Sequence, residues 1–241
     1  MDLQPKGKII KSFYNELPED YEEALTYLSN QLDGFSKYVG IVKFDMNIIT
    51  KLGEDAVIIA KQKGLEVFYD LSSENLSTQV YLATCRGVKI INVNVSGDIN
   101  LLQLAKSSME MALLENKKLR RPILIASTDS VDVDCNTILS GNVIKSSLKF
   151  VINVFNLNYD GVMCSTSEIH YLKNDNYLPE NFLFITPSIV PEWSFFYDKD
   201  SFMTPSEAIK AGSDLIVVDN SMKFIDGAKK ILSEVTASMS A

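Results

Sequence analysis

The stretches Ile123-Leu124-Ile125-Ala126 and Leu215-Ile216-Val217-Val218 are continuous apolar runs. A strand has a continuous apolar sequence when both of its faces are buried, as in a parallel sheet that is covered by helices. A strand with one face in water alternates apolar and polar residues instead. The two runs therefore predict a parallel sheet in an α/β protein.

Outward from these runs, short β-branched stretches alternate with longer amphipathic ones along the whole chain of 241 residues. The predicted strands are Lys8–Phe13, Val39–Phe44, Glu66–Leu71, Lys89–Val95, Pro122–Ser127, Gly161–Ser165, Phe182–Thr186 and Asp214–Val218. The predicted helices are Asp20–Leu32, Ile48–Lys63, Asn75–Arg86, Asn100–Asn116, Asn142–Asn156, Ser206–Ala211 and Met222–Val235. Eight such units predict a (β/α)8 TIM barrel, with an open doubly wound sheet as the alternative. Because no linker or low-complexity tract divides residues 1–241, we expect a single barrel domain.

The composition excludes several classes of protein. The chain has 46% hydrophobic residues, which is too many for a disordered chain, and its net charge of -8 argues against generic nucleic-acid binding. It has no apolar run of roughly 18 residues and no secretory signal, so we expect no membrane partner. Three widely separated cysteines are typical of a reducing compartment, and we expect a cytoplasmic protein.

In a TIM barrel the active site forms where the strands end. Lys43 ends the second predicted strand and Asp70 the third, so barrel closure places them side by side. Each charge would offset the desolvation of the other. A structural ion pair at the end of the barrel and a catalytic pair are both consistent with this pattern.

The other candidate residues are ambiguous. His170, the only histidine, is interpreted as a loop residue, with general-base catalysis as the alternative. The basic run Lys117–Arg121 follows a helix, whose dipole it would complement. The aromatic segment Trp193–Tyr197 is a lid, a self-packed loop or a dimer contact. Cys164 lies in an apolar strand and is interpreted as a core residue.

The sequence contains neither of the glycine-rich phosphate-binding motifs, G-x-G-x-x-G or G-x-x-x-x-G-K-[ST]. The acidic residues Asp129, Asp132 and Asp134 lie in one predicted loop and are interpreted as solvated rather than metal-binding. We therefore expect no cofactor and no metal.

The chain resembles the orotidine 5'-monophosphate decarboxylase family from about Lys8 to Ser238, and four segments show the resemblance most clearly. Gly64–Leu71 is similar to its third strand, which ends in a D-x-K-x-x-D motif, and Ile185–Ile189 is similar to its T-P-G-I turn. Thr204–Ile209 resembles T-P-x-x-A-I, and Gly212–Val218 resembles the start of G-x-D-x-I-V-V-G-R. The resemblance implies a TIM barrel, a carboxy-lyase of pyrimidine biosynthesis and a homodimer whose subunits share a Lys–Asp–Lys–Asp array.

Half of that array is replaced in this chain. The resemblance places Lys43 at the first lysine and Asp70 at the first aspartate, but Ser72 at the second lysine and Asn75 at the aspartate of the partner subunit. In the family the second lysine protonates the carbanion. A serine hydroxyl supplies neither an acidic proton nor a positive charge. The two changes cancel in net charge.

The ligand-binding positions change in parallel. Ser188 replaces the T-P-G-I glycine, and Asp219-Asn220 replaces the Gly-Arg that would hold a phosphate. The first strand ends in Ser12–Asn15 without the aspartate that holds the ribose, whereas Ser130 matches the base-contacting serine.

Three hypotheses follow. The chain is a divergent relative with lost or much reduced decarboxylase activity, an active lyase on another substrate that uses Lys43 and Asp70 with His170 or a water, or a non-catalytic binding homodimer. For the homodimer we expect the Ser72–Val80 segment near the two-fold axis, and for the ligand a pyrimidine nucleotide or another small molecule.

Overall fold

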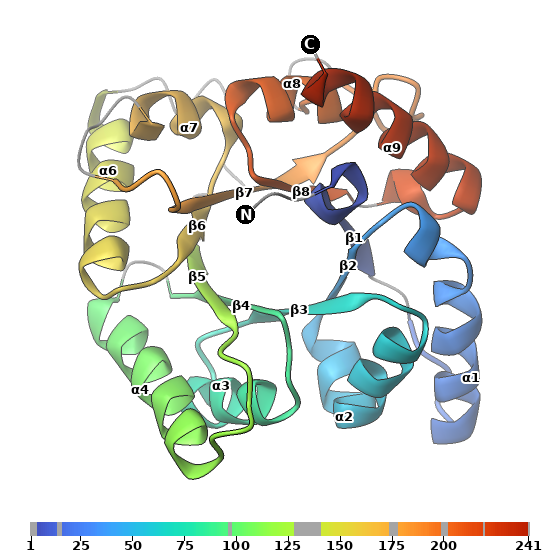
Figure 1. Cartoon of the computed structure of the whole chain (residues 1–241), viewed down its shortest axis with the longest axis horizontal. Coiled ribbons are helices and arrows are strands. Elements are labelled where there is room, and N and C mark those ends of the chain that lie inside the picture. Colours follow the sequence, from blue (N-terminus) through green and yellow to red (C-terminus); the bar gives the residue numbers. More distant parts are fainter. Residues whose placement is uncertain are drawn as a thin grey trace.

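The computed structural model describes residues 4–13, 16–95, 98–127, 141–173, 178–198, 202–218 and 220–240. These residues form a closed barrel of eight parallel strands in the order of the chain, surrounded by helices (Figure 1). The strands are β1 (Ile9–Phe13), β2 (Ile41–Phe44), β3 (Glu66–Leu71), β4 (Ile90–Asn94), β5 (Ile123–Ser127), β6 (Gly161–Met163), β7 (Leu183–Ile189) and β8 (Leu215–Val218). The predicted TIM barrel is confirmed, and the open sheet is excluded because β1 pairs with β8.

Helices follow the strands around the outside of the barrel (Figure 1). They are α1 (Tyr21–Leu32), α2 (Met46–Gln62), α3 (Leu76–Cys85), α4 (Ile99–Glu115), α6 (Gly141–Asn156), α7 (Thr166–Lys173), α8 (Pro205–Ala211) and α9 (Ile225–Met239), with short 3-10 turns η1 (Pro5–Lys8), η2 (Phe35–Lys37) and η4 (Asn220–Met222). The predicted last helix is wrong at its start, where η4 precedes α9. The C-terminal helix α9 packs on α8 and on η1.

Helix α7 is absent from our predictions, although its sequence contains a start signal. Ser165-Thr166-Ser167-Glu168 has the form of a capping box. In the structure the Ser165 backbone N–H and hydroxyl both donate to Glu168 Oε2 at 2.8 Å. The backbone N–H of Glu168 donates to the Ser165 hydroxyl at 3.4 Å. The predicted sixth strand was too long because Ser165 belongs to this cap.

The strands bury both faces, as the continuous apolar runs predicted. On β5, Ile125 lies in the cluster inside the barrel, while Leu124 and Ala126 belong to the larger core between the strands and the helices. The inner cluster takes alternate residues from successive strands, as period-two alternation requires. Its buried members are Ile10, Ile41, Phe68, Ile90, Ile125, Met163, Ile185, Leu215 and Val217.

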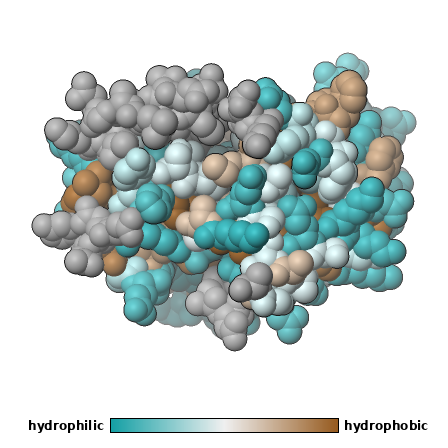
Figure 2. Space-filling view, turned by 90° about the horizontal axis from the view of Figure 1, so that it is seen from above, coloured by the Kyte–Doolittle hydropathy of each residue, from teal (hydrophilic) through white to brown (hydrophobic). Residues whose placement is uncertain are grey.

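The outside of the molecule is mostly hydrophilic on the face seen in Figure 2, with separate hydrophobic patches between the polar side chains. In the part of the chain that the structure describes, no helix is long and apolar enough to cross a membrane.

Candidate functional site at the end of the barrel

A layer of polar side chains lies directly above the apolar cluster at the end of the barrel where the strands finish. Each member lies two residues after an inward-facing apolar residue of β1 to β5, for example Lys43 after Ile41 and Asn92 after Ile90. Because side chains on a strand alternate between its faces, all of these residues point into the same opening. We call this set the polar layer: Ser12, Lys43, Asp70, Asn92 and Ser127.

An ion pair and two hydrogen bonds connect four members of the polar layer. Lys43 Nζ lies 2.7 Å from Asp70 Oδ2. The Asn92 side-chain amide donates to Asp70 Oδ1 at 2.7 Å and to Ser127 Oγ at 2.8 Å. The structure thus brings Lys43 and Asp70 together as predicted. Asn92 is a site residue that our sequence analysis missed, although its period-two spacing from Ile90 marks it as inward-facing.

Burial makes the Lys43–Asp70 pair electrostatically significant. The side chain of Lys43 is 7% exposed and that of Asp70 is 29% exposed. The ammonium of Lys43 also lies 6.0 Å from the centre of the Phe68 ring. A lysine this deep needs a counter-ion, because an uncompensated charge in a poorly solvated position is costly. The pair can orient a ligand or stabilise negative charge on it.

Three buried polar oxygens near the same end of the barrel have no hydrogen-bond partner in the part of the chain that the structure describes. They are Ser12 Oγ, Asn92 Oδ1 and Asn94 Oδ1. Buried polar atoms are nearly always paired, so each such atom needs an explanation. Two of them, Ser12 Oγ and Asn92 Oδ1, belong to the polar layer. All three atoms could accept a hydrogen bond from N–H or O–H groups of a bound molecule.

The two replaced positions of the resemblance lie in the turn between β3 and α3. The side chains of Ser72 and Asn75 are both exposed, in contrast to Lys43. Asn75 adopts a left-handed conformation with φ of 49° just before α3 and makes no side-chain cap. Since residues 71–76 read Leu-Ser-Ser-Glu-Asn-Leu, this turn brings no cation to the polar layer.

Ser188 occupies a backbone position suited to glycine. Its φ is 57°, within the left-handed region that favours glycine, and the pairing of β7 with β8 shifts register there. Strand β7 extends through this position to Ile189, beyond the predicted end at Thr186. Ser188 thus carries a side chain at a position whose backbone conformation favours glycine.

Several predicted site residues fall outside what the structure describes, and His170 lies on a helix outside the barrel. Ser130 and Asp219 lie outside the described residues, as do Asp129, Asp132 and Asp134. Asn220 is the first residue of η4. His170 is exposed on α7, with its ring against Tyr171 at 5.7 Å between centroids, so its interpretation as a loop residue is wrong.

The aromatic segment 193–197 follows β7 and is largely in solvent. Phe195 is 96% exposed, and its ring makes an edge contact with Phe196. Trp193 lies against α9, where Lys230 Nζ is 4.9 Å from the centre of its ring. The segment is therefore partly packed on α9, and its role as a lid or a dimer contact stays a prediction.

The described part of the structure shows a buried thiol at Cys164 and no cluster of metal ligands. Cys164 is buried, and burial raises the pKa of its thiol well above the usual range, which agrees with a core residue. Among the described residues, no three His, Cys, Asp or Glu side chains gather closely enough to hold a metal ion.

Comparison with known proteins finds relatives that share one name. No protein-family model matches the chain. Orotidine 5'-phosphate decarboxylase of Haemophilus influenzae is 28% identical over 228 residues, which cover 91% of this chain and 96% of that protein. The enzyme of the same name from Pasteurella multocida is 29% identical over 229 residues, covering 92% and 94% of the two chains.

A solved structure agrees with the fold. Orotidine 5'-phosphate decarboxylase from Lactobacillus acidophilus superposes with a TM-score of 0.70 at 21% identity and covers 98% of this chain and 100% of its own. The sequence relatives share both the name and nearly the full length of the chain. The chain is therefore similar to orotidine 5'-phosphate decarboxylases over nearly its whole length.

Proposed function

We propose that this barrel binds a small ligand at the polar layer and has lost most or all of the decarboxylase activity of its family. The observation that most supports this proposal is Ser72. Its side chain is exposed and uncharged at the position where the resemblance implies the proton-donating lysine. The Lys43–Asp70 pair remains at 2.7 Å, but it is half of the array.

The chemistry of decarboxylation explains why this loss matters. Loss of carbon dioxide from the pyrimidine ring leaves a carbanion, which needs a fixed positive charge and then a proton. Ser72 can supply neither, because an aliphatic hydroxyl is uncharged and weakly acidic. The Asp219-Asn220 pair further lacks the arginine whose phosphate binding would help to hold the reacting ring.

The test is turnover of orotidine monophosphate, followed over hours by the loss of orotate-type ultraviolet absorbance with excess protein. The Haemophilus influenzae relative, assayed alongside, is the positive control. We expect a rate near background, and we expect the variant Ser72→Lys/Asn75→Asp to stay near background because the phosphate positions remain altered. Steady turnover by the unmodified protein would refute the proposal. Recovery by the double variant would show that the phosphate site is intact.

An active lyase on a different substrate is the second candidate. The unpartnered oxygens Ser12 Oγ, Asn92 Oδ1 and Asn94 Oδ1 favour it, because they suit a ligand that carries hydrogen-bond donors. His170 lies exposed on α7, so a water is the better proton carrier beside Lys43 and Asp70. Thermal denaturation with uridine monophosphate and related ligands tests for binding: a ligand at 100 times its Kd stabilises by about 2.7 kcal/mol. No shift with any pyrimidine nucleotide would favour a different ligand class.

We also propose that the chain forms a cytoplasmic homodimer of one barrel domain per subunit, with the Ser72–Val80 segment near the two-fold axis. The support is the resemblance, in which the residue that matches Asn75 acts in the partner's site. Within this segment Ser72, Ser73, Glu74, Asn75 and Thr78 are exposed in the single chain. Light scattering at micromolar concentration should give twice the mass of the chain, and a monomer would contradict this proposal.

A further inference from the structure

A second polar hollow lies at the opposite end of the strands from the polar layer. Strand β3 begins there at Glu66, and Lys89 immediately precedes β4. The Lys89 backbone N–H donates to Val67 O at 2.9 Å, and the Ile123 N–H donates to Lys89 O at 2.9 Å. The starts of three neighbouring strands are therefore aligned, and they border a hollow of about 550 Å³. This volume falls within the roughly 300–1,000 Å³ that is usual for small-molecule sites.

The hollow is lined by cations, although the chain as a whole is acidic. Lys61, Lys89, Arg120 and Arg121 border it, against one carboxylate, Glu66. We call these five residues the basic hollow. The lining thus carries more positive than negative side chains, in a chain whose net charge is -8.

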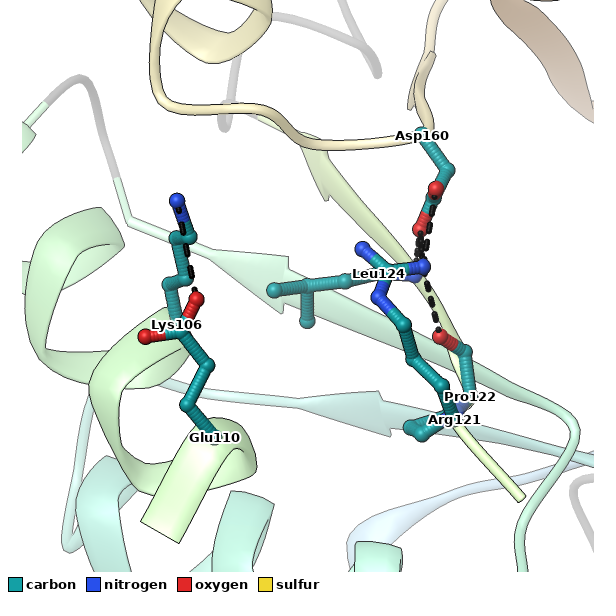
Figure 3. Close-up of polar contacts among 6 residues, drawn as sticks. All are labelled: Lys106, Glu110, Arg121, Pro122, Leu124 and Asp160. Atoms are coloured by element: carbon teal, nitrogen blue, oxygen red, sulfur yellow. Dashed lines mark hydrogen bonds and ion pairs between the residues drawn. The ribbon is translucent and has the colours of Figure 1, made fainter. Parts of the chain in front are cut away.

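Two of the cations already have protein partners. Lys61 Nζ donates to Arg86 O at 3.3 Å, at the C-terminal end of α3, where a cation complements the helix dipole. Gly87, with φ of 69°, leaves room for that ammonium: a β-carbon there would lie 2.9 Å from Lys61 Nζ. Arg121 Nη1 donates to both carboxylate oxygens of Asp160, at 2.9 and 2.8 Å (Figure 3).

Lys89 and Arg120 are different. Neither has an ion pair or a side-chain hydrogen bond with the part of the chain that the structure describes. Neither lies in the last turn of a helix, because α4 ends at Glu115 and Lys89 follows α3 by four residues. The helix dipole, by which we interpreted the basic run Lys117–Arg121, therefore does not account for the positions of these two side chains.

We propose that the basic hollow is a binding site for a polyvalent phosphate anion, a di- or triphosphate group. Such a group carries several charged oxygens, which can contact Lys89 and Arg120 together and leave the Lys61 and Arg121 contacts intact. Free polyphosphate and a nucleoside triphosphate share this chemistry. The site is separate from the polar layer, and it does not depend on the function proposed for that layer.

The test is isothermal titration of the full-length protein at low salt with tripolyphosphate, pyrophosphate, sulfate and adenosine triphosphate. We expect affinity to fall from tripolyphosphate to pyrophosphate to sulfate. Tighter binding of adenosine triphosphate than of tripolyphosphate would identify a nucleotide as the ligand, and the reverse order would identify free polyphosphate.

The variant Lys89→Gln/Arg120→Gln should weaken tripolyphosphate binding at least tenfold. The matched control is Lys117→Gln/Lys118→Gln, which removes the same charge from exposed residues of the same basic run outside the hollow. It should change affinity less than twofold, and both variants should keep the thermal midpoint of the parent.

Three results would overturn the proposal: no binding of tripolyphosphate, equal weakening in both double variants, or loss of binding in Lys43→Met with retention in Lys89→Gln/Arg120→Gln. The second result would indicate a non-specific charge effect. The third would assign the anion to the polar layer at the other end of the barrel.

Discussion

Replacement of Asn92 by alanine should destabilise the protein far more than the same replacement at Asn94. Both residues are asparagines on β4, two positions apart, and therefore face the same way. Asn92 is 1% exposed, and its amide donates to Asp70 Oδ1 and to Ser127 Oγ. Asn94 makes no side-chain hydrogen bond with the described residues, and its Oδ1 is buried without a partner.

The magnitude follows from these contacts. A hydrogen bond to a charged group contributes about 1.5–3 kcal/mol and one to a neutral group about 1 kcal/mol. Asn92→Ala loses one of each, so we expect the free energy of unfolding to fall by about 3 kcal/mol. In a chain of this length that lowers Tm by about 6–12 °C. Asn94→Ala removes no hydrogen bond to the described residues, and we expect a change within about 0.5 kcal/mol.

Urea denaturation followed by far-ultraviolet circular dichroism measures both changes under identical conditions. Ser127→Ala, which removes only the neutral partner, should fall between the two variants. If Asn92→Ala and Asn94→Ala were equally destabilised, the hydrogen bonds of the polar layer would contribute nothing to stability. The network that orients Asp70 would then have to be rejected.

Three further predictions concern single residues. Burial raises the pKa of Glu234, so the protonated carboxyl is favoured in the folded state, and this stabilisation is lost as pH rises through that pKa. The variant Glu234→Gln keeps an acceptor for the Ser206 N–H and carries no charge. It should raise Tm at pH 7 and leave it unchanged at pH 4. Iodoacetamide should modify the exposed Cys85 in the folded protein and the buried Cys164 only after unfolding, as read by peptide mass spectrometry. Ser188→Gly should be neutral or stabilising, whereas Ser188→Val should cost about 1–2 kcal/mol in urea denaturation, because its φ is 57°.

Much of the fold could be predicted from the sequence because burial on both faces leaves a continuous apolar run. The run Ile123–Ala126 lies within β5, and the run Leu215–Val218 forms β8. Helix α7 could not be found from apolar periodicity, because it has only 8 residues and its start depends on the polar pair Ser165 and Glu168. The end of β7 depends on one backbone conformation at Ser188, which residue type alone does not give.

The candidate site could be predicted only in part. Lys43 and Asp70 were recognisable because charged residues at the ends of neighbouring buried strands must compensate each other. Asn92 carries no charge, so its importance appears only when the structure shows its amide between Asp70 and Ser127. The basic hollow joins residues near the starts of β3, β4 and β5 with Lys61 of α2, and no local pattern links Lys61 to Arg120.

Lys43 and Asp70 stabilise each other in the folded protein, whatever the polar layer does. Loss of Asp70 would remove the counter-ion that lies 2.7 Å from Lys43, whose side chain is 7% exposed, and loss of Lys43 would leave Asp70 with a weaker partner. Positions 72 and 75 are exposed in the turn after β3. Because water solvates a charge there, a charged or an uncharged side chain at either position changes stability little. Folding therefore favours keeping Lys43 and Asp70 together whether or not the barrel catalyses a reaction, whereas the exposed turn places no such demand on position 72. The proposal of lost activity therefore rests on Ser72 and not on the ion pair.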